Sequence, residues 1–463
     1  MGVDVLGRDA VLRDLAQVIP ASELITDEAS TQGYRYDHAR FCPAGVPLAV
    51  VRPAITAEVS GILRVATAHR IPVVPQGART GLAGAANAVD GCIVISFERM
   101  DRILRLDPVE QVAVVQPGVV NARLQQAAAE HGLFFAPDPS SFRESTIGGN
   151  ISTGAGGMRC LKYGVTREAV RALEVVLADG EVLRTGTPTA KGVAGYDLTR
   201  LLVGSEGTLG VITEATVALR PLPEPALTLA AVFPSTSTAM AAVAAIMAAG
   251  QPPSLLEFLD EACVRAVQSY RDLGLPEETG ALLLAQSDRG TRAAEDVAGM
   301  AEACLAAGAS ETAVASDETE SELLLEARRL VHWGVDALGS TLVEDVCVPR
   351  ARLVEFVEGL QDISKEHGLL ITCAGHAGDG NMHPTVVFER GDAEVERRAY
   401  AAFGAVMALG LELGGTITGE HGIGVLKREW LARELSPTAL RVQLALKQAL
   451  DPLGILNPGK VFK

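Results

Sequence analysis

The feature that most restricts the fold is a glycine- and histidine-rich stretch at residues 371–383, which reads I-T-C-A-G-H-A-G-D-G-N-M-H. A short apolar run leads into His376 and His383, and Gly378 and Gly380 lie between these two histidines. Glycine allows backbone turns and weakens helices, so a loop or a turn between strands must bring the two imidazoles together. A second compact motif, T-G-E-H-G, follows at residues 418–422. We interpret the two motifs as parts of one site.

The size and charge of the chain restrict its class. With 463 residues, of which 48% are hydrophobic, the chain is too long for one ordinary core and predicts two or three packed domains. Lys plus Arg number 40 and Asp plus Glu 57, which gives a net charge of −17. This balance argues against nucleic acid or an anionic membrane surface as the main partner. An anionic substrate would therefore need a local cation or a metal.

Cysteine usage and hydropathy indicate the cellular compartment of the protein. The seven cysteines are odd in number and form no C-x-x-C pair, as expected for reduced thiols in the cytoplasm. No signal peptide is evident at the N-terminus, and the Ala-rich run at 239–250 is too short to span a bilayer. We expect a cytoplasmic protein without a transmembrane segment, with peripheral attachment to a membrane as the alternative.

The order of predicted elements gives an α+β fold. A helix and a polar, aromatic arm occupy residues 1–45. Strands, helices and a hairpin around Asp179-Gly180 fill residues 46–222, up to the proline-rich segment 220–225. Two β-α-β runs follow within residues 223–415 and predict a ferredoxin-like antiparallel sheet with helices on one face. Thr319 and Glu322 predict a capping box at the start of a helix over 320–333. Residues 416–463 form the last segment.

Two glycine-rich segments carry the chemistry of the first half. Residues 76–84 follow a predicted strand directly, and residues 146–157 form the second segment. Such loops expose backbone N–H groups that suit phosphate oxygens. Neither segment has the G-x-G-x-x-G or the P-loop spacing, so a nicotinamide-binding fold is disfavoured. One such loop alone can simply serve a tight turn, but two in one domain favour a phosphate-bearing cofactor.

Four motifs then carry a resemblance to a known family. They are P-Q-G-A-R-T-G-L at 75–82, P-D-P-S at 137–140, T-I-G-G-N at 146–150 and G-S-E-G-T-L-G at 204–210. In this order they resemble the FAD-binding domain of the vanillyl-alcohol-oxidase superfamily. The resemblance implies that residues 46–222 form two small α+β subdomains with FAD between them. The second loop would run along the ribityl chain and isoalloxazine, and Glu206 and Ile212 would flank the adenine end.

The resemblance assigns the pyrophosphate to the N–H groups of Gly77, Arg79, Thr80 and Gly81. Ala85 and Ala86 stand where a glycine is frequent in the family. Residues 76–84 contain no His or Cys for a covalent flavin link, so non-covalent FAD is expected. The full set of residues that the resemblance assigns to FAD is Pro75, Gln76, Gly77, Ala78, Arg79, Thr80, Gly81, Leu82, Pro137, Asp138, Ser140, Thr146, Gly148, Gly149, Asn150, Ser152, Thr153, Gly157, Glu206, Gly207, Gly210, Ile212 and Asn457.

The histidine motifs predict a metal site even without the family. Two imidazoles and a carboxylate form a common catalytic set that leaves positions open for substrate, and Glu420 is the obvious carboxylate. The plainer alternative is that His376 and His383 are hydrogen-bonded polar residues lining a turn.

A second resemblance covers residues 35–463. The motifs G-H-x-G-D-G-N-x-H at 375–383, T-G-E-H-G-I-G at 418–424 and N-P-G-K at 457–460 are similar to those of FAD-linked D-2-hydroxyacid dehydrogenases. That group includes the glycolate oxidase flavoprotein subunit, D-lactate dehydrogenases and D-2-hydroxyglutarate dehydrogenase. It implies a divalent metal on His376, His383 and Glu420, zinc first and manganese or iron as alternatives. Asn381 would orient the substrate and His421 would be the general base. Residues 223–415 would bind substrate, and 416–463 would return to the FAD domain.

The implied reaction removes a proton from the hydroxyl group and a hydride from the carbon that bears it. The substrate carboxylate requires a cation, for which we select Arg328, with Arg329 as the second choice. A solvated arginine on a helix face is the alternative for Arg328. Dicarboxylate-oxidising relatives would carry a Lys on the following strand, whereas residues 342–346 contain neither Lys nor Arg. The sequence therefore favours a monocarboxylate such as D-lactate, glycolate or a larger apolar 2-hydroxy acid.

Electrons would pass to a quinone, a cytochrome or an electron-transfer flavoprotein and not to NAD. A homodimer or a complex with an iron–sulfur subunit is the expected assembly. Three alternatives stay open from the sequence. They are a D-2-hydroxyglutarate dehydrogenase, an FAD-binding subunit of a heteromeric glycolate oxidase without its own catalysis, and a metal hydrolase whose glycine loops hold a nucleotide.

Overall fold

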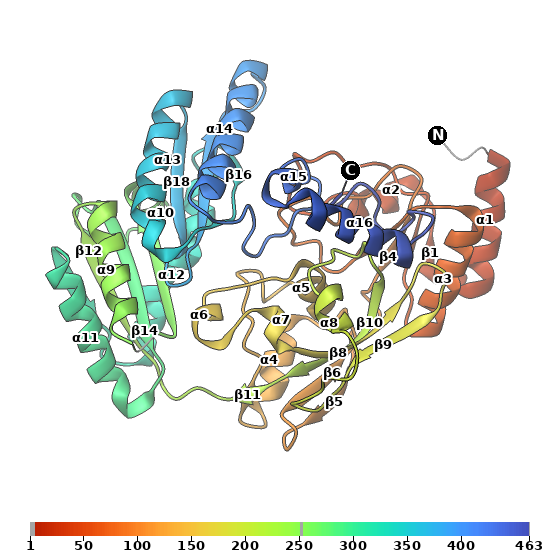
Figure 1. The fold of residues 1–463 in the computed structure, drawn as a ribbon, viewed down its shortest axis with the longest axis horizontal. Helices are drawn as coiled ribbons and strands as arrows, with labels where there is room; N and C mark the ends of the chain where they lie inside the picture. The colour runs from red at the N-terminus through yellow and green to blue at the C-terminus, as the bar shows by residue number, and fades with distance from the viewer. Residues whose placement is uncertain (1–4, 251–252, 463) are drawn as a thin grey trace. The chain divides into compact units, whose positions relative to one another are not determined.

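The computed structural model describes residues 5–250 and 253–462, which separate into two compact units. The first unit comprises residues 5–156, 164–222 and 420–462, and the second comprises 157–163 and 223–419. The main boundary between the two units therefore lies between Leu222 and Pro223, inside the proline-rich segment. Figure 1 shows the elements of both units.

The first sheet of the first unit has the strand order β1-β2-β4-β3. Its strands are β1 (Leu24–Ile25), β2 (Ala49–Val51), β3 (Val73–Gln76) and β4 (Ile93–Ser96). Strands β2, β3 and β4 are parallel, and helix α3 (Thr56–His69) makes the crossover from β2 to β3. Apolar residues of the three strands pack with α3 and α1 (Val5–Val18) in one core, so the sheet end that follows Gln76 is firmly held.

The second sheet is antiparallel, with the order β5-β6-β10-β8-β9. Its strands are β5 (Ile103–Asp107), β6 (Val112–Val115), β8 (Val170–Val176), β9 (Val182–Gly186) and β10 (Val211–Ala218). Val176 pairs with Val182 across the turn at Asp179-Gly180, which confirms the predicted hairpin. Helices α4 (Asn121–Ala129), α5 (Ile147–Thr153) and α8 (Leu198–Leu202) contribute residues to its core.

The remaining elements of the first unit are short or peripheral. They are the pair β7 (Leu133–Phe134) and β11 (Arg220–Pro221), and the helices α2 (Glu28–Thr31), α7 (Thr166–Ala169), α15 (Leu431–Glu434) and α16 (Pro437–Leu450).

The second unit is built on one antiparallel sheet with the order β15-β12-β14-β13-β18-β19-β16, and β17 also pairs with β19. Its strands are β12 (Leu227–Phe233), β13 (Leu255–Asp260), β14 (Ala281–Ser287), β15 (Glu311–Val314), β16 (Ser340–Val343), β17 (Val346–Cys347), β18 (Leu370–His376) and β19 (Asn381–Phe388). The first four strands have the 4-1-3-2 order of a ferredoxin-like β-α-β-β-α-β unit, which confirms the predicted α+β class.

Helices pack on both faces of this sheet, although the sequence predicted one face. Leu255 and Leu259 of β13 pack with α10 (Glu261–Tyr270) and α12 (Glu318–Asp336). The alternate residues Leu256 and Phe258 are also buried and point to the other face, where α9 (Thr236–Ala248) packs. The other helices of the unit are α6 (Cys160–Tyr163), α11 (Ala293–Ala306), α13 (Leu353–His367) and α14 (Ala393–Glu412).

One local prediction is wrong for an identifiable reason. Thr319 and Glu322 do not cap α12, because Asp317 is the N-cap and its carboxylate accepts from the Glu320 N–H at 2.9 Å. Of the two connections expected between the histidines, a loop or a turn between strands, the structure has the turn, and pairing resumes at Asn381 in strand β19.

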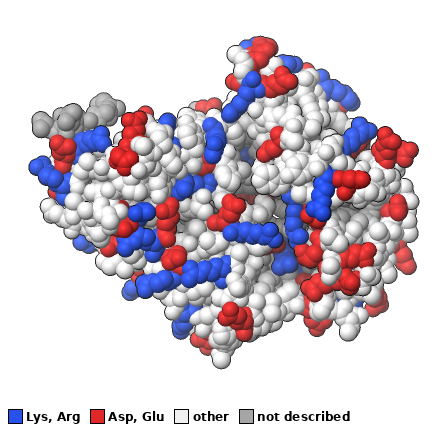
Figure 2. Space-filling view, turned by 180° about the vertical axis from the view of Figure 1, so that it is seen from behind, with Lys and Arg blue, Asp and Glu red and all other residues white. Residues whose placement is uncertain are grey.

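Among the described residues, no helix is both long and apolar enough to cross a membrane. On the face that Figure 2 presents, Lys and Arg side chains are interspersed with Asp and Glu and form no continuous basic surface. That distribution agrees with the excess of acidic residues in the sequence.

Candidate active site

The two glycine-rich segments of the first unit meet where a side chain would not fit. A Cβ on Gly77 would lie 2.3 Å from Thr146 Oγ1 and 3.6 Å from the Gly149 backbone. Gly77 follows β3, while Thr146 is the N-cap of α5 and its hydroxyl accepts from the Gly149 N–H at 3.4 Å. The structure thus brings the two glycine-rich segments together in one backbone surface. The second segment is largely the short helix α5 and not an open loop.

The G-S-E-G-T-L-G motif at 204–210 packs against the P-Q-G-A-R-T-G-L motif at 75–82. Gly207 has φ +70°, and a Cβ there would lie 2.5 Å from Pro75 Cγ. Asn457 donates to the carbonyls of Ala85, at 2.9 Å, and Glu206, at 2.7 Å. The C-terminal N-P-G-K motif therefore ties the residue just after the first glycine-rich segment to the G-S-E-G-T-L-G motif.

Glu206 binds the loop that follows His421. Its buried carboxylate accepts from the N–H groups of Ile423 and Gly424 at 2.7 and 2.8 Å, so both oxygens are engaged by this loop. Burial raises the pKa of Glu206 to about 7, and these two N–H donors partly offset the rise. The side chain of Ile212 packs in the core of the second sheet.

Several other predicted FAD residues have structural contacts. Gly148 is required by packing, because a Cβ there would lie 2.4 Å from Pro117 Cβ. The carbonyl of Pro137 accepts from Asn121 Nδ2 at 3.0 Å. Lys460 was not selected from the sequence, yet it is buried and donates to the carbonyl of Asn87 at 2.5 Å, and burial lowers its pKa to about 8. Lys460 is the last residue of the N-P-G-K motif, so that motif could have indicated it.

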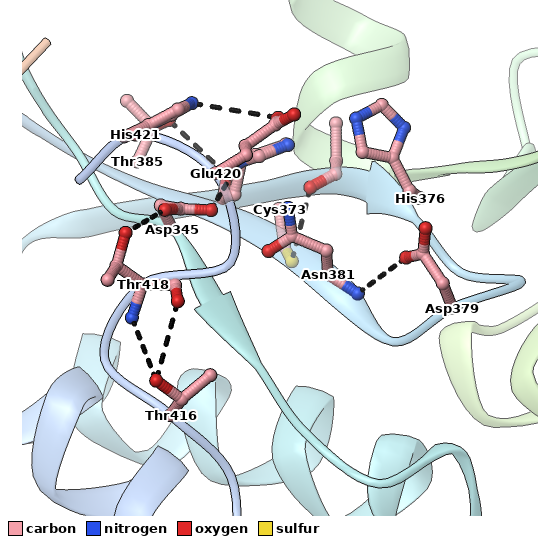
Figure 3. A network of polar contacts seen from close by, with 12 residues as sticks. Asp345, Cys373, His376, Asp379, Asn381, Thr385, Thr416, Thr418, Glu420 and His421 are labelled. Carbon is pink, nitrogen blue, oxygen red and sulfur yellow. Dashed lines mark hydrogen bonds and ion pairs between the residues drawn. The ribbon is translucent and has the colours of Figure 1, made fainter. Parts of the chain in front are cut away.

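In the second unit, strands β18 and β19 place both histidines on one face of the sheet. His376 pairs with Asn381 and Ala374 pairs with His383, so the two histidines are diagonal neighbours. Their ring centroids are 5.2 Å apart, with the planes at 88°. Gly380 closes the turn with φ +89°, where a Cβ would lie 2.1 Å from the carbonyl oxygen of Val348. Figure 3 shows His376 and Asn381 at the two ends of this turn.

Each histidine has a carboxylate beside it. Glu257 Oε1 is 2.7 Å from His376 Nδ1, and Glu257 Oε2 accepts from Arg328 Nε at 2.7 Å. Burial alone would raise the pKa of Glu257, but its interactions with His376 and Arg328, which include a hydrogen bond to each, outweigh burial and hold this pKa below its usual range. For the second histidine, Asp345 Oδ1 is 3.9 Å from His383 Nδ1. Neither Glu257 nor Asp345 lies in the motifs that predicted the site.

Asp345 also holds the segment that leads to Glu420 and His421. Its Oδ2 accepts from Thr418 Oγ1 at 2.6 Å (Figure 3). Its carbonyl accepts from the Gly419 N–H at 3.2 Å. Glu420 is the next residue along the chain. Within the first unit, His421 Nε2 lies 3.8 Å from Glu420 Oε1, and both side chains are mostly buried.

Asn381 and Arg328 are the other two residues of the second unit to which the resemblance assigns a role. A Cβ on Gly419 would be 2.4 Å from Asn381 Oδ1, so the amide of Asn381 lies against the backbone of the T-G-E-H-G motif. Arg328 has a side chain that is only 16% exposed, which rules out a solvated arginine on a helix face. Arg329 is 43% exposed and pairs with Glu322. These placements favour Arg328 over Arg329 as the buried cation.

Together, the fold and these motifs define a flavoprotein oxidoreductase. Residues 222–461 match the family model described as FAD linked oxidases, C-terminal domain, and residues 47–186 match the FAD binding domain. The chain belongs to this FAD-linked oxidase family.

Particular relatives are similar over nearly the whole chain. The glycolate oxidase subunit GlcD of Bacillus subtilis is 42% identical over 454 residues, which cover 98% of this chain and 96% of that protein. A D-lactate dehydrogenase of Archaeoglobus fulgidus is 36% identical, with 98% of each chain covered. Among solved structures, 4-ethylphenol oxidase from Gulosibacter chungangensis has a TM-score of 0.80 at 20% identity, covering 100% of this chain and 98% of that one. This last likeness shows the vanillyl-alcohol-oxidase type of fold.

Proposed function

We propose that this protein oxidises a D-2-hydroxy acid to the 2-oxo acid, with FAD as the hydride acceptor and a divalent metal at the substrate. The observation that carries the proposal is the buried group formed by His376, His383, Glu257 and Arg328 on one face of a sheet. In this group the two histidines offer nitrogen ligands for a metal, and Arg328 offers a positive charge for the carboxylate of the substrate. Relatives named glycolate oxidase subunit and D-lactate dehydrogenase support the same class of substrate.

The residues present fit both FAD and a divalent metal. For FAD, the meeting of Gly77 with Thr146 gives a backbone surface into which no Cβ fits, as a closely bound pyrophosphate requires. For the metal, imidazole nitrogens and carboxylate oxygens suit zinc, manganese or iron. We assign the metal to His376, His383 and Glu420, and we add Asp345 because its carboxylate lies beside His383. Bound FAD would accept the two electrons of the hydride, and a bound divalent ion would lower the pKa of the substrate hydroxyl.

The other roles belong to side chains of this protein. Arg328 binds the substrate carboxylate through the two Nη groups, since its Nε already donates to Glu257. His421 accepts the hydroxyl proton as a neutral imidazole. Asn381 orients the substrate from its place against Gly419.

The substrate class follows from charge. Glu344 and Asp345 are both fully buried at the end of β16, where a dicarboxylate substrate would need a cation. Acids at this place offer no cationic partner to a second substrate carboxylate, which supports D-lactate, glycolate or a similar monocarboxylate. A quinone, a cytochrome or an electron-transfer flavoprotein would then reoxidise the flavin.

The decisive experiment is an anaerobic flavin-reduction screen over D- and L-2-hydroxy acids, with and without a chelator. We expect D-lactate or glycolate to bleach the flavin absorbance and the chelator to prevent it. If every acid leaves the flavin oxidised while metal is bound, the proposal is wrong. Bleaching by the isolated chain would also exclude a purely FAD-binding subunit, which needs its partner for catalysis.

The general base is tested by His421→Ala. We expect this variant to keep FAD and metal at wild-type levels and to lose flavin reduction, because the other groups stay in place. Measured FAD and metal content provide the control. Reduction at nearly the wild-type rate would assign the base to another residue.

A further inference from the structure

We propose that Glu257 is a positioning residue that orients both His376 and Arg328, so that one buried carboxylate links metal binding to substrate binding. The roles of the two partners rest on the function proposed above, whereas the contacts of Glu257 stand independently of it. Nothing in the sequence motifs singles out this residue.

Glu257 is placed by the pairing of β13 with β18. Phe258 is opposite Gly375 and Leu259 is opposite Ala374, so one further step of this register puts Glu257 opposite His376. The neighbouring residues of β13 are apolar and buried, and the Glu257 side chain has no exposed surface. A lone acid in such a strand is costly unless each oxygen is satisfied. Here each oxygen has one partner, His376 or Arg328.

The contact with His376 fixes the tautomer of the imidazole. A carboxylate only accepts hydrogen bonds, so the 2.7 Å distance to Nδ1 means that Nδ1 carries the proton. In the neutral imidazole that metal binding requires, the lone pair is then on Nε2, which would be the ligand nitrogen. A carboxylate behind a metal-binding imidazole both orients the ring and makes it a stronger donor.

The contact with Arg328 orients the guanidinium. Because this group is planar, engaging Nε fixes the plane and leaves the two Nη groups as a fork for a second carboxylate. Losing Glu257 would therefore loosen two partners at once. A merely structural ion pair would affect stability and neither the metal affinity nor the KM.

The test uses the FAD-loaded protein with Glu257→Gln and a matched control, Asp260→Asn. Asp260 is a buried acid on the same strand, but its carboxylate caps α10 and binds the Cys373 N–H instead. Zinc affinity is measured without substrate, by competition with a chromophoric chelator. We expect Glu257→Gln to bind zinc about 10- to 100-fold more weakly and Asp260→Asn to bind as wild type.

Steady-state kinetics then report on Arg328. We expect Glu257→Gln to raise the KM for the hydroxy acid while the flavin content stays unchanged. If Glu257→Gln does not fold, Glu257→Asp replaces it, since it keeps the charge and shortens the reach by one methylene. It should show smaller changes in the same direction.

The outcomes separate the inference from the function. Wild-type zinc affinity and KM in whichever variant folds would overturn the positioning role and leave the proposed function standing. A wild-type protein that binds no metal and oxidises no hydroxy acid would instead overturn the proposed function.

Discussion

Replacing Gly424 by alanine tests how firmly the loop after His421 is tied to the first glycine-rich segment. Gly424 has φ +52°, and a Cβ there would lie 2.0 Å from the carbonyl oxygen of Ala83. That oxygen accepts from the N–H groups of Val425 and Leu426 at 2.9 and 3.2 Å. No flexible side chain can relieve the clash, because the obstructing atom belongs to the backbone.

The expected cost can be worked from these contacts. A left-handed backbone costs a residue with a Cβ about 1–2 kcal/mol. Displacing the Ala83 carbonyl weakens two hydrogen bonds worth about 1 kcal/mol each. Gly424→Ala should therefore destabilise the first unit by roughly 3–4 kcal/mol, close to half of a typical domain stability. FAD should also be bound more weakly, because Ala83 lies in the 76–84 segment.

The control is Gly454→Ala, which shares the left-handed conformation, φ +66°, but has nothing within 4 Å of the added Cβ. It should cost only about 1–2 kcal/mol. Urea unfolding is followed by flavin release for the first unit, since two units need not unfold as one. Flavin retention after gel filtration gives an independent measure. Equal losses in the two variants would refute the close approach of Gly424 to Ala83.

Three further predictions follow from single contacts. Burial raises the pKa of Asp260 from 3.8 to about 6, so folding favours the protonated carboxyl group. The free energy of unfolding should therefore fall by roughly 3 kcal/mol as the pH rises from the unfolded pKa to the folded pKa. Asp260→Asn should flatten the fall in urea midpoint between pH 4 and 6, and an unchanged slope would contradict the assignment. A Cβ on Gly378 would lie 2.3 Å from Leu161 Cδ2. Gly378→Ala should therefore destabilise the second unit and Leu161→Ala should rescue it in the double variant, whereas additive losses would argue against the contact. Arg328→Lys should raise the KM for the hydroxy acid roughly tenfold through loss of the bidentate fork, with Arg329→Lys unchanged, and equal KM values would remove Arg328 from substrate binding.

The sequence was most informative where chemistry and backbone conformation coincide. Glycine at 378 and 380 excluded a helix, and the turn between His376 and Asn381 is indeed closed by Gly380 at positive φ. The hairpin at Asp179-Gly180 was equally readable, because the turn dipeptide and its flanking strands are contiguous. Capping residues were less readable, because two side chains that can cap a helix lie within a few residues of each other. Asp317, and not Thr319, caps α12.

What the sequence alone determined is the family, the two glycine-rich segments and the histidine motifs that supply the candidate metal donors. These are carried by contiguous motifs whose backbone needs and side-chain chemistry do not depend on distant parts of the chain. Only the tertiary structure decided that Glu257 lies beside His376 and Arg328, that Asp345 lies beside His383, and that Glu206 binds the loop after His421. These pairs are separated by 38 to more than 200 positions, so no local pattern could reveal them. Strand register brings Glu257 to His376, while helix packing and loop contacts bring the other partners together.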